Sequence, residues 1–310
     1  MVTDYIRFDW AMKRLLRNKA NHAVLEGLLT SLLNEKITIV RFLESEGNQE
    51  DDDDKYNRVD LLAENDKQEL IIVEIQNSRE LTYFHRMLYG VSKAITEYIG
   101  LSDSYDKVRK IYSVNIVYFE LGQGSDYVYH GKTIFQGLHD PHDILKLSVR
   151  QNERFFGNRQ SETLVRKDAG DLFPEYYVLR VNDFDKVAKT PLDEWMEFLK
   201  TGQIDNNAKA PGLAEARNCL RIDALSTNDK RSYYRHMESV RHMRSLFDTS
   251  RDEGWAEGRA EGRAAGIEEG RAEGRAEGIR QVALALKRNG VPAATISQST
   301  GLSVDEIDKL

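Results

Sequence analysis

Two apolar runs flank a polar turn between Val59 and Gln76, and no other part of the chain limits the fold so strongly. The pattern predicts a β-hairpin whose turn is centred near Lys67. In that register Asp60 lies directly opposite Glu74, because each of them is seven positions from the turn centre. Opposed Cβ atoms on one face of a sheet are about 5 Å apart, so the two carboxylates face each other across the hairpin.

Two carboxylates at that separation repel each other unless a proton or a cation lies between them. Gln76 follows Glu74 by two residues and therefore shares its face of the strand. Two carboxylates and an amide on one face suit a hydrated Mg²⁺ ion. A solvated hairpin edge is the alternative interpretation, although an unpaired charge between Val73 and Ile75 would be costly.

The composition restricts the class of protein. The 310 residues are 40% hydrophobic and 31% charged, which is typical of a soluble protein with one large or two modest domains. The sequence contains no apolar run of about 18 residues and begins with a polar segment, so we expect neither a membrane span nor a secretory leader. The single Cys219 fits a cytoplasmic location. The net charge of −7 argues against a protein that coats nucleic acid, but a local basic wall would still allow a nuclease.

The remaining patterns predict an α/β fold, with a mixed sheet flanked by helices. Helices are expected over residues 4–18, 22–33, 80–99, 192–200, 213–225 and 228–247, and strands over 37–43, 111–119 and 176–181. A second hairpin is expected between Tyr127 and Phe135. The segment His139-Asp140-Pro141-His142 is predicted to be a turn, not a metal site, because proline favours a loop there.

Five stretches carry a further signal, and they are FDWAMKRLL (residues 8–16), residues 28–34, RVD (58–60), VEIQ (73–76) and FHRMLY (84–89). Their order and spacing resemble the recombination-promoting nuclease family, whose members are also labelled putative transposases, in the PD-(D/E)xK nuclease superfamily. The resemblance implies a restriction-endonuclease-like sheet followed by a helical subdomain and a helical repeat tail. It also implies an endonuclease acting on DNA in recombination, mobile-element activity or phage defence.

Family resemblance also assigns roles at the predicted hairpin. Asp60 and Glu74 would bind Mg²⁺, or Mn²⁺ in its place, together with the carbonyl of Ile75. Gln76 would position the attacking water. The metal would lower the pKa of that water and stabilise charge at the phosphate.

DNA contacts are expected from Lys13 and from the helix after the hairpin. Arg86 and Tyr89 are three residues apart and can face the same way on that helix. A phosphate oxygen would be the partner of Arg86 in a nuclease, whereas the alternative is an ion pair with a neighbouring carboxylate.

Two residues depart from the family pattern. Val59 replaces the proline that names the superfamily, and Gln76 stands where the last motif has lysine. A neutral amide can hold water but supplies no positive charge near the scissile phosphate. The alternative function is therefore a catalytically weak or inactive nuclease fold that serves as a DNA-binding or self-assembling module.

A four-residue unit, roughly Glu-Gly-Arg-Ala, recurs from Glu253 to Gly278. In a helix this unit stacks like charges, and each glycine costs about 1 kcal/mol relative to alanine. We therefore expect either a flexible spacer or a helix that forms on self-association, with the chain as a homo-oligomer through residues 251–310. The predicted division is a nuclease domain (1–184), a helical subdomain (185–250), the repeat (251–280) and a helix-turn-helix-like tail (281–310).

Overall fold

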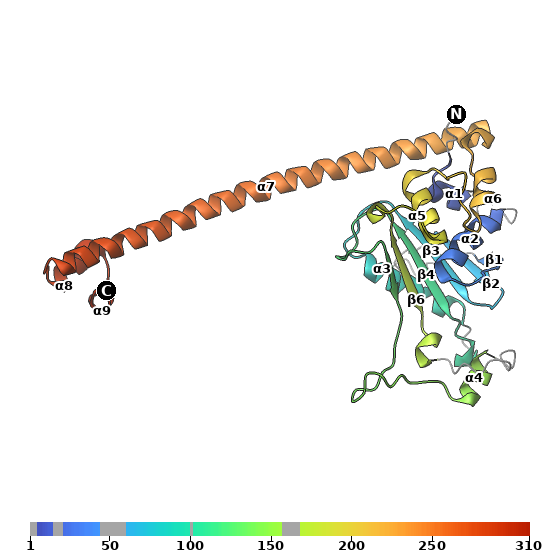
Figure 1. The fold of residues 1–310 in the computed structure, drawn as a ribbon, viewed down its shortest axis with the longest axis horizontal. Coiled ribbons are helices and arrows are strands. Elements are labelled where there is room, and N and C mark those ends of the chain that lie inside the picture. Colours follow the sequence, from blue (N-terminus) through green and yellow to red (C-terminus); the bar gives the residue numbers. More distant parts are fainter. Residues whose placement is uncertain (1–4, 15–20, 44–59, 100–101, 157–167) are drawn as a thin grey trace. The chain divides into compact units, whose positions relative to one another are not determined.

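The computed structural model describes residues 5–14, 21–43, 60–99, 102–156 and 168–310 (Figure 1). The chain divides into two compact units, Met1–Val240 and Arg241–Leu310, and the division falls within helix α7 (Thr227–Arg288). Within the described ranges, every helix is too short or too polar to cross a lipid bilayer.

The described residues of the first unit form a mixed sheet of six strands in the order β1-β2-β3-β4-β6-β5. The strands are β1 (Ile39–Leu43), β2 (Leu61–Asn65), β3 (Leu70–Gln76), β4 (Ile111–Val117), β5 (Val128–Gly131) and β6 (Glu175–Arg180). β3, β4 and β6 run parallel, whereas β1, β2 and β5 form antiparallel pairs with their neighbours. This arrangement confirms the predicted mixed sheet.

The predicted second hairpin is wrong. Of the residues between Tyr127 and Phe135, only β5 is a strand, and it pairs with β6 instead of the residues that follow it. Residue Gln136 instead forms an isolated bridge with Ile144. The local alternation of polar and apolar residues identified the strand, but its partner lies far downstream in the sequence.

Helices cover both faces of the sheet (Figure 1). Helix α3 (Tyr83–Glu97) packs on one face, where it covers Leu70 and Ile72 of β3. The opposite side chains of β3, Ile71, Val73 and Ile75, enter the main core because successive residues of a strand point to opposite faces. That core is completed by α1 (Phe8–Arg14), α2 (His22–Leu33), α5 (Pro191–Thr201) and α6 (Leu213–Cys219).

Ring contacts in the main core join α1 to α5, which are far apart in the sequence. Phe8 of α1 lies edge-on to Trp195 and to Phe198 of α5, with ring centroids 5.9 and 6.3 Å apart. All three side chains are buried. The core therefore needs residues on both sides of the predicted boundary at residue 184, and the four-part division of the chain stays a prediction.

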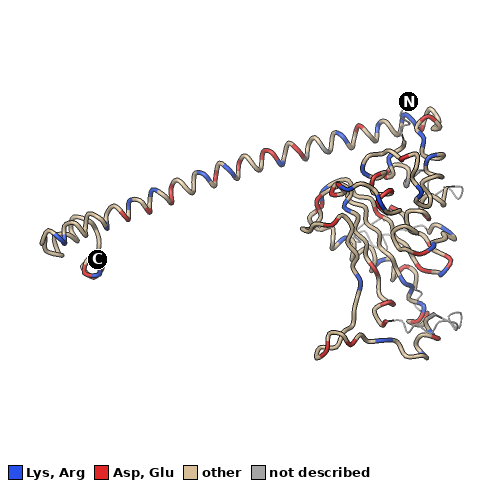
Figure 2. Tube along the Cα trace, viewed as in Figure 1, with Lys and Arg blue, Asp and Glu red and all other residues tan. Residues whose placement is uncertain are grey.

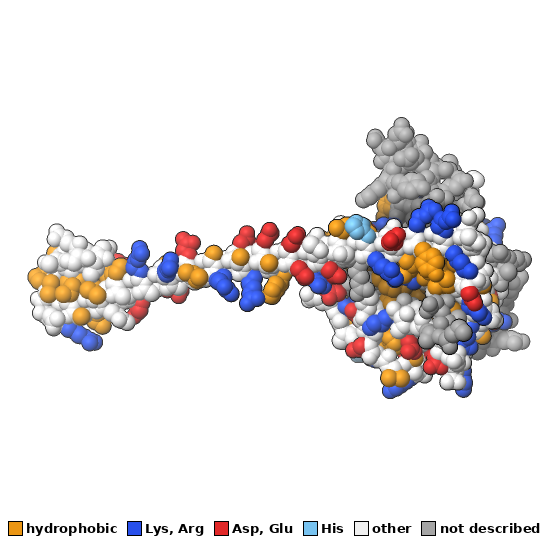
Figure 3. Space-filling model, turned by 90° about the horizontal axis from the view of Figure 1, so that it is seen from above, with side chains coloured by type: hydrophobic (Ala, Val, Ile, Leu, Met, Phe, Trp, Pro, Cys, Tyr) orange, Lys and Arg blue, Asp and Glu red, His pale blue; other side chains and the backbone are white. Residues whose placement is uncertain are grey.

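The second unit contains the rest of α7, α8 (Ala293–Thr300) and α9 (Val304–Asp308). The repeat is helical along its whole length, so the structure shows no flexible spacer there. Acidic and basic residues alternate along α7 (Figure 2), and over its middle they gather on opposite sides of the helix (Figure 3). A small core of Ala283, Ile296 and Ile307 packs α7 against α8 and α9.

Candidate metal centre

The β2–β3 hairpin has the register that the sequence predicts. Leu61 pairs with Val73, and Leu62 pairs with Ile72. One further step in this register places Asp60 opposite Glu74. The two residues are therefore neighbours where β2 begins and β3 approaches its end.

Asn65 builds the turn that sets this register. Its side-chain oxygen accepts hydrogen bonds from the backbone N–H groups of Lys67 and Glu69, at 3.0 and 2.8 Å. Gln68 takes a left-handed conformation with φ of 64°. An asparagine that hydrogen-bonds its own turn is a common way to close a short loop.

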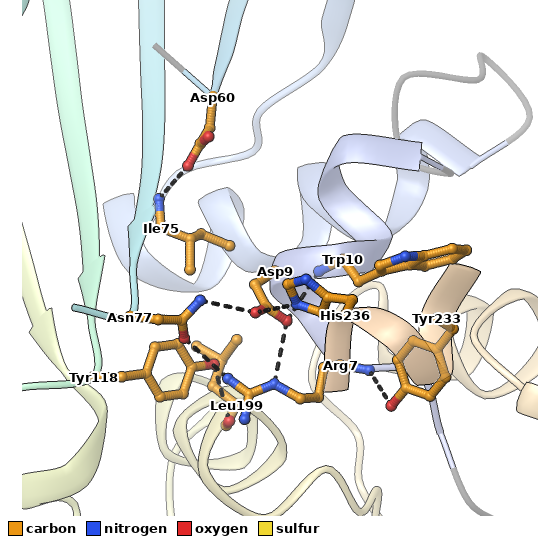
Figure 4. A network of polar contacts seen from close by, with 10 residues as sticks. All are labelled: Arg7, Asp9, Trp10, Asp60, Ile75, Asn77, Tyr118, Leu199, Tyr233 and His236. Atoms are coloured by element: carbon orange, nitrogen blue, oxygen red, sulfur yellow. Dashed lines mark hydrogen bonds and ion pairs between the residues drawn. The ribbon is translucent and has the colours of Figure 1, made fainter. Parts of the chain in front are cut away.

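Asp60 is tied directly to β3. Its Oδ2 accepts a hydrogen bond of 2.9 Å from the backbone N–H of Ile75 (Figure 4). The N–H and C=O groups of one strand residue point to the same side. The carbonyl of Ile75 therefore lies on the Asp60 side of β3, as a third oxygen near the two carboxylates.

Glu74 is almost fully buried, with 5% of its surface exposed. Its Oε2 lies 3.4 Å from the Tyr83 hydroxyl and 3.6 Å from Nε of Arg86. Burial raises the pKa of this carboxyl to about 7, although the Arg86 charge opposes the rise and the Asp60 charge adds to it. Glu74 is thus a buried carboxylate with few close donors.

Two residues that the sequence analysis missed complete the surroundings of Glu74. Asn115 lies beside Glu74 on β4, and its Oδ1 accepts a hydrogen bond of 3.2 Å from the Tyr83 hydroxyl. Burial and the nearby Glu74 charge raise the pKa of Tyr83, so its hydroxyl remains a donor. The spacing of Tyr83 and Arg86, three residues apart on α3, was a signal that could have identified Tyr83.

The sequence around these residues matches a family of known proteins. Residues 6–136 match the model of a family described as PD-(D/E)XK nuclease family transposase. Over residues 6–136 the chain therefore resembles a PD-(D/E)XK nuclease domain. Searches of curated proteins and of solved structures found no match.

The structure places the other predicted site residues in different surroundings. Gln76 is half-buried at the end of β3, on the face that carries Glu74. Arg86 pairs with Glu80 at 3.3 Å as well as with Glu74, which is the ion-pair alternative. Tyr89 is half-buried on α3. The side chain of Lys13 lies outside the described residues, and its DNA contact stays a prediction, as do the roles of Gln76, Arg86 and Tyr89.

The donor set fits a divalent cation that keeps several of its water ligands, such as Mg²⁺. Among the residues that the structure describes, no three histidine, cysteine, aspartate or glutamate side chains gather as a metal cluster. Two carboxylates and a carbonyl are instead the partial set that Mg²⁺ completes with water. Nε of Arg86 is buried without a hydrogen-bond partner, so the guanidinium neutralises Glu74 only by charge.

Two other carboxylates of the first unit have structural roles. Glu26 of α2 accepts a hydrogen bond of 2.7 Å from the backbone N–H of Ile39. Asp140 accepts one of 2.9 Å from the backbone N–H of His142, which confirms the predicted turn.

A second buried carboxylate lies just past β3, on the other side of the sheet (Figure 4). Asp9 accepts hydrogen bonds from Trp10 N at 2.9 Å, Arg7 Nε at 3.2 Å and Asn77 Nδ2 at 2.9 Å, and it lies 2.9 Å from His236 Nε2. Burial opposes ionisation of Asp9, but the bonds and charges of His236 and Arg7 outweigh it and hold the pKa well below its usual range.

Proposed function

We propose that this chain is a DNA endonuclease that uses Mg²⁺ or Mn²⁺, held by Asp60, Glu74 and the carbonyl of Ile75. The main support is the convergence of Asp60 and Glu74 where the hairpin register brings them together. When bound, the metal would supply a water of lowered pKa and stabilise charge at the phosphate. The family match adds DNA as the substrate class.

The protein's own groups would position water and phosphate. Gln76 shares the face of Glu74 and can hold a water by hydrogen bonds, but it brings no charge. Arg86 is a source of positive charge close to the site, since its Nε lies 3.6 Å from Glu74 and 35% of its side chain is exposed. A guanidinium with free N–H groups can bind a phosphate oxygen.

Cleavage of supercoiled plasmid tests this proposal. We expect wild-type protein with Mg²⁺ or Mn²⁺ to nick the plasmid, and Asp60→Asn and Glu74→Gln to lose on the order of a thousandfold in rate, because metal stabilisation of charge contributes several kcal/mol. Glu80→Gln is the matched control, since it removes a carboxylate that also pairs with Arg86. Equal nicking by all four proteins would show a contaminating nuclease and refute the proposal.

The ion pair between Arg86 and Glu74 supports a second candidate function. A guanidinium that neutralises Glu74, together with the uncharged Gln76, suits an inactive nuclease fold that binds DNA or assembles without cutting. That function predicts DNA binding that Glu74→Gln leaves unchanged and no cleavage by the wild type with either metal.

We infer that α7 mediates self-association of the chain. Its acidic and basic side chains occupy opposite sides of the helix, and its glycines from 254 to 278 have open space around them (Figure 3). The acidic side of one chain can meet the basic side of another, at a few tenths of a kcal/mol per pair.

Charge reversal tests that contact in the full-length chain. Replacing Arg259, Arg263, Arg271 and Arg275 by glutamate should lower the sedimenting mass, because it leaves only acidic sides to meet. A second variant should also sediment with a lower mass on its own, and it carries arginine in place of Glu257, Glu261, Glu273 and Glu277. A mixture of the two variants should recover the larger mass. Unchanged mass in both variants would refute the association. A cytoplasmic role in recombination, mobile-element activity or phage defence is part of the same proposal.

A further inference from the structure

An apolar pocket of about 400 Å³ opens between α3 and the β5–β6 edge of the sheet. Four of its lining side chains carry rings, and the lining residues are Phe84, Met87, Leu88, Tyr129, His130, Gly131, Tyr176 and Val178. Phe84 is 53% exposed although it is a large apolar residue. The pocket therefore offers ring faces to a ligand from solvent.

The pocket shares a face and a row of the sheet with the candidate metal centre. The strand pairings align Glu74 with Asn115, Asn115 with Val178, and Val178 with Tyr129. Neighbouring strands are about 4.8 Å apart, so Val178 is about 10 Å and Tyr129 about 14 Å from Glu74. On α3, Phe84 directly follows Tyr83, whose hydroxyl lies beside Glu74.

The ring of Tyr129 is held in place before any ligand arrives. Its hydroxyl accepts a hydrogen bond of 3.0 Å from the backbone N–H of Asp126. Gly124 allows this approach, since a Cβ there would lie 2.0 Å from the Tyr129 hydroxyl. The guanidinium of Arg180 lies 5.8 Å from the ring centroid. A fixed ring loses little conformational freedom when a flat ligand stacks on it.

We propose that this pocket binds an unpaired nucleobase of the DNA strand whose phosphate lies at Glu74. Bases of every sequence stack on aromatic rings, and a base within a duplex must leave its helix to do so. The proposal rests on the proposed nuclease function and makes it specific, with single-stranded or distorted DNA as the preferred substrate. The row of the sheet connects the two sites over a span of a few nucleotides, and Arg86 supplies positive charge at the phosphate end.

Single-stranded oligonucleotides that contain 2-aminopurine test the pocket, because the fluorescence of this base falls when it stacks on a ring. The protein is the full chain carrying Glu74→Gln, so that the DNA stays intact. We expect quenching on binding at one or two positions of the oligonucleotide. Adding Phe84→Ala should abolish the quenching. It should also weaken single-strand binding by on the order of tenfold, because the stacking of one base on the Phe84 ring is lost.

Two further variants make the test specific. Phe84→Tyr retains a ring and should retain the quenching. Leu81→Ala removes another exposed apolar side chain, 87% exposed and outside the pocket, and should change nothing. Duplex binding should be the same in all of these proteins.

The outcomes separate the pocket from the nuclease proposal. If wild type cleaves DNA but Phe84→Ala binds and quenches like its parent, the pocket proposal is wrong and the nuclease proposal stands. If Phe84→Ala instead lowers the sedimenting mass with no effect on DNA, the pocket is a contact between copies of the chain, and the proposal is again wrong. Wild type that neither binds nor cuts DNA would overturn both.

Discussion

Asp9 of α1 and Glu74 of β3 are both buried carboxylates, with 2% and 5% exposure, yet their surroundings differ. Asp9 has four polar partners within 3.2 Å, from Arg7, Trp10, Asn77 and His236. Glu74 has contacts only at 3.4 and 3.6 Å in the part of the chain described, apart from the nearby charge of Asp60. The pKa of Asp9 is lowered, and that of Glu74 is raised to about 7.

The difference is the one expected between a structural carboxylate and the proposed metal ligand Glu74. A carboxylate whose oxygens are all engaged stabilises the fold and has no capacity for a ligand. A buried carboxylate with long contacts and a second carboxylate beside it destabilises the fold until a proton or cation neutralises it. Groups of this kind cluster at functional sites.

The largest effect on stability is expected from Asp9→Ala. This change leaves Arg7 and His236 without their carboxylate partner. Breaking a buried pair costs about 3 to 5 kcal/mol. We expect the lower end here, because both partners are partly exposed. Urea unfolding monitored by circular dichroism measures the loss. Asp9→Ala as stable as wild type would remove the contrast between the two carboxylates.

The second prediction concerns pH and Glu74. Its pKa is about 7 in the folded chain and 4.5 for an unperturbed glutamate, so the folded state holds the proton more tightly. Without metal, the free energy of unfolding should therefore fall as the pH rises from 4.5 to 7, by up to about 3 kcal/mol, and stay low above pH 7. Urea titrations in the presence of a chelator measure this slope.

Glu74→Gln is the control for that slope and should flatten it. Added Mg²⁺ should restore stability to the wild type at pH 8, by about 1.4 kcal/mol at ten times its dissociation constant, and should do nothing for Glu74→Gln. The pH dependence that Asp9 contributes to the free energy of unfolding has the opposite sign. Its lowered pKa gives stability that is lost only as the pH falls below about 4. A wild-type stability that rises between pH 4.5 and 7 would contradict the raised pKa of Glu74.

The smallest effect is expected from Tyr83→Phe. It removes one buried hydroxyl that donates to Asn115 and lies beside Glu74, at a cost of about 1 kcal/mol in unfolding free energy. Loss of this donor should also raise the pKa of Glu74 further. The pH profile of plasmid cleavage should then shift to higher pH, and an unshifted profile would show that Tyr83 does not act on Glu74.

The sequence predicted the hairpin and its register because both are local. A turn built by Asn65 relates Asp60 to Glu74 by counting alone, and alternation of polar and apolar residues identifies the strands. The carboxylate pair could therefore be predicted, and so could α2, whose bounds His22–Leu33 agree with the prediction.

The remaining parts of the site depend on contacts between distant segments. Asn115 reaches Glu74 only after β4 has paired with β3 through a crossover, and Tyr83 reaches it only when α3 packs on the sheet. His236 and Asp9 are 227 residues apart. No local pattern contains such a pairing, and the same reason explains why β5 was assigned to the wrong partner.

The place of β6 has a consequence for the boundaries of the domain. β6 lies between β4 and β5 and carries the residues 175–180, beyond the 6–136 range that matches the family. A fragment cut to that range would expose the edge of β4 and leave β5 without hydrogen bonds. The segment that matches the family is thus shorter than the sheet to which it belongs.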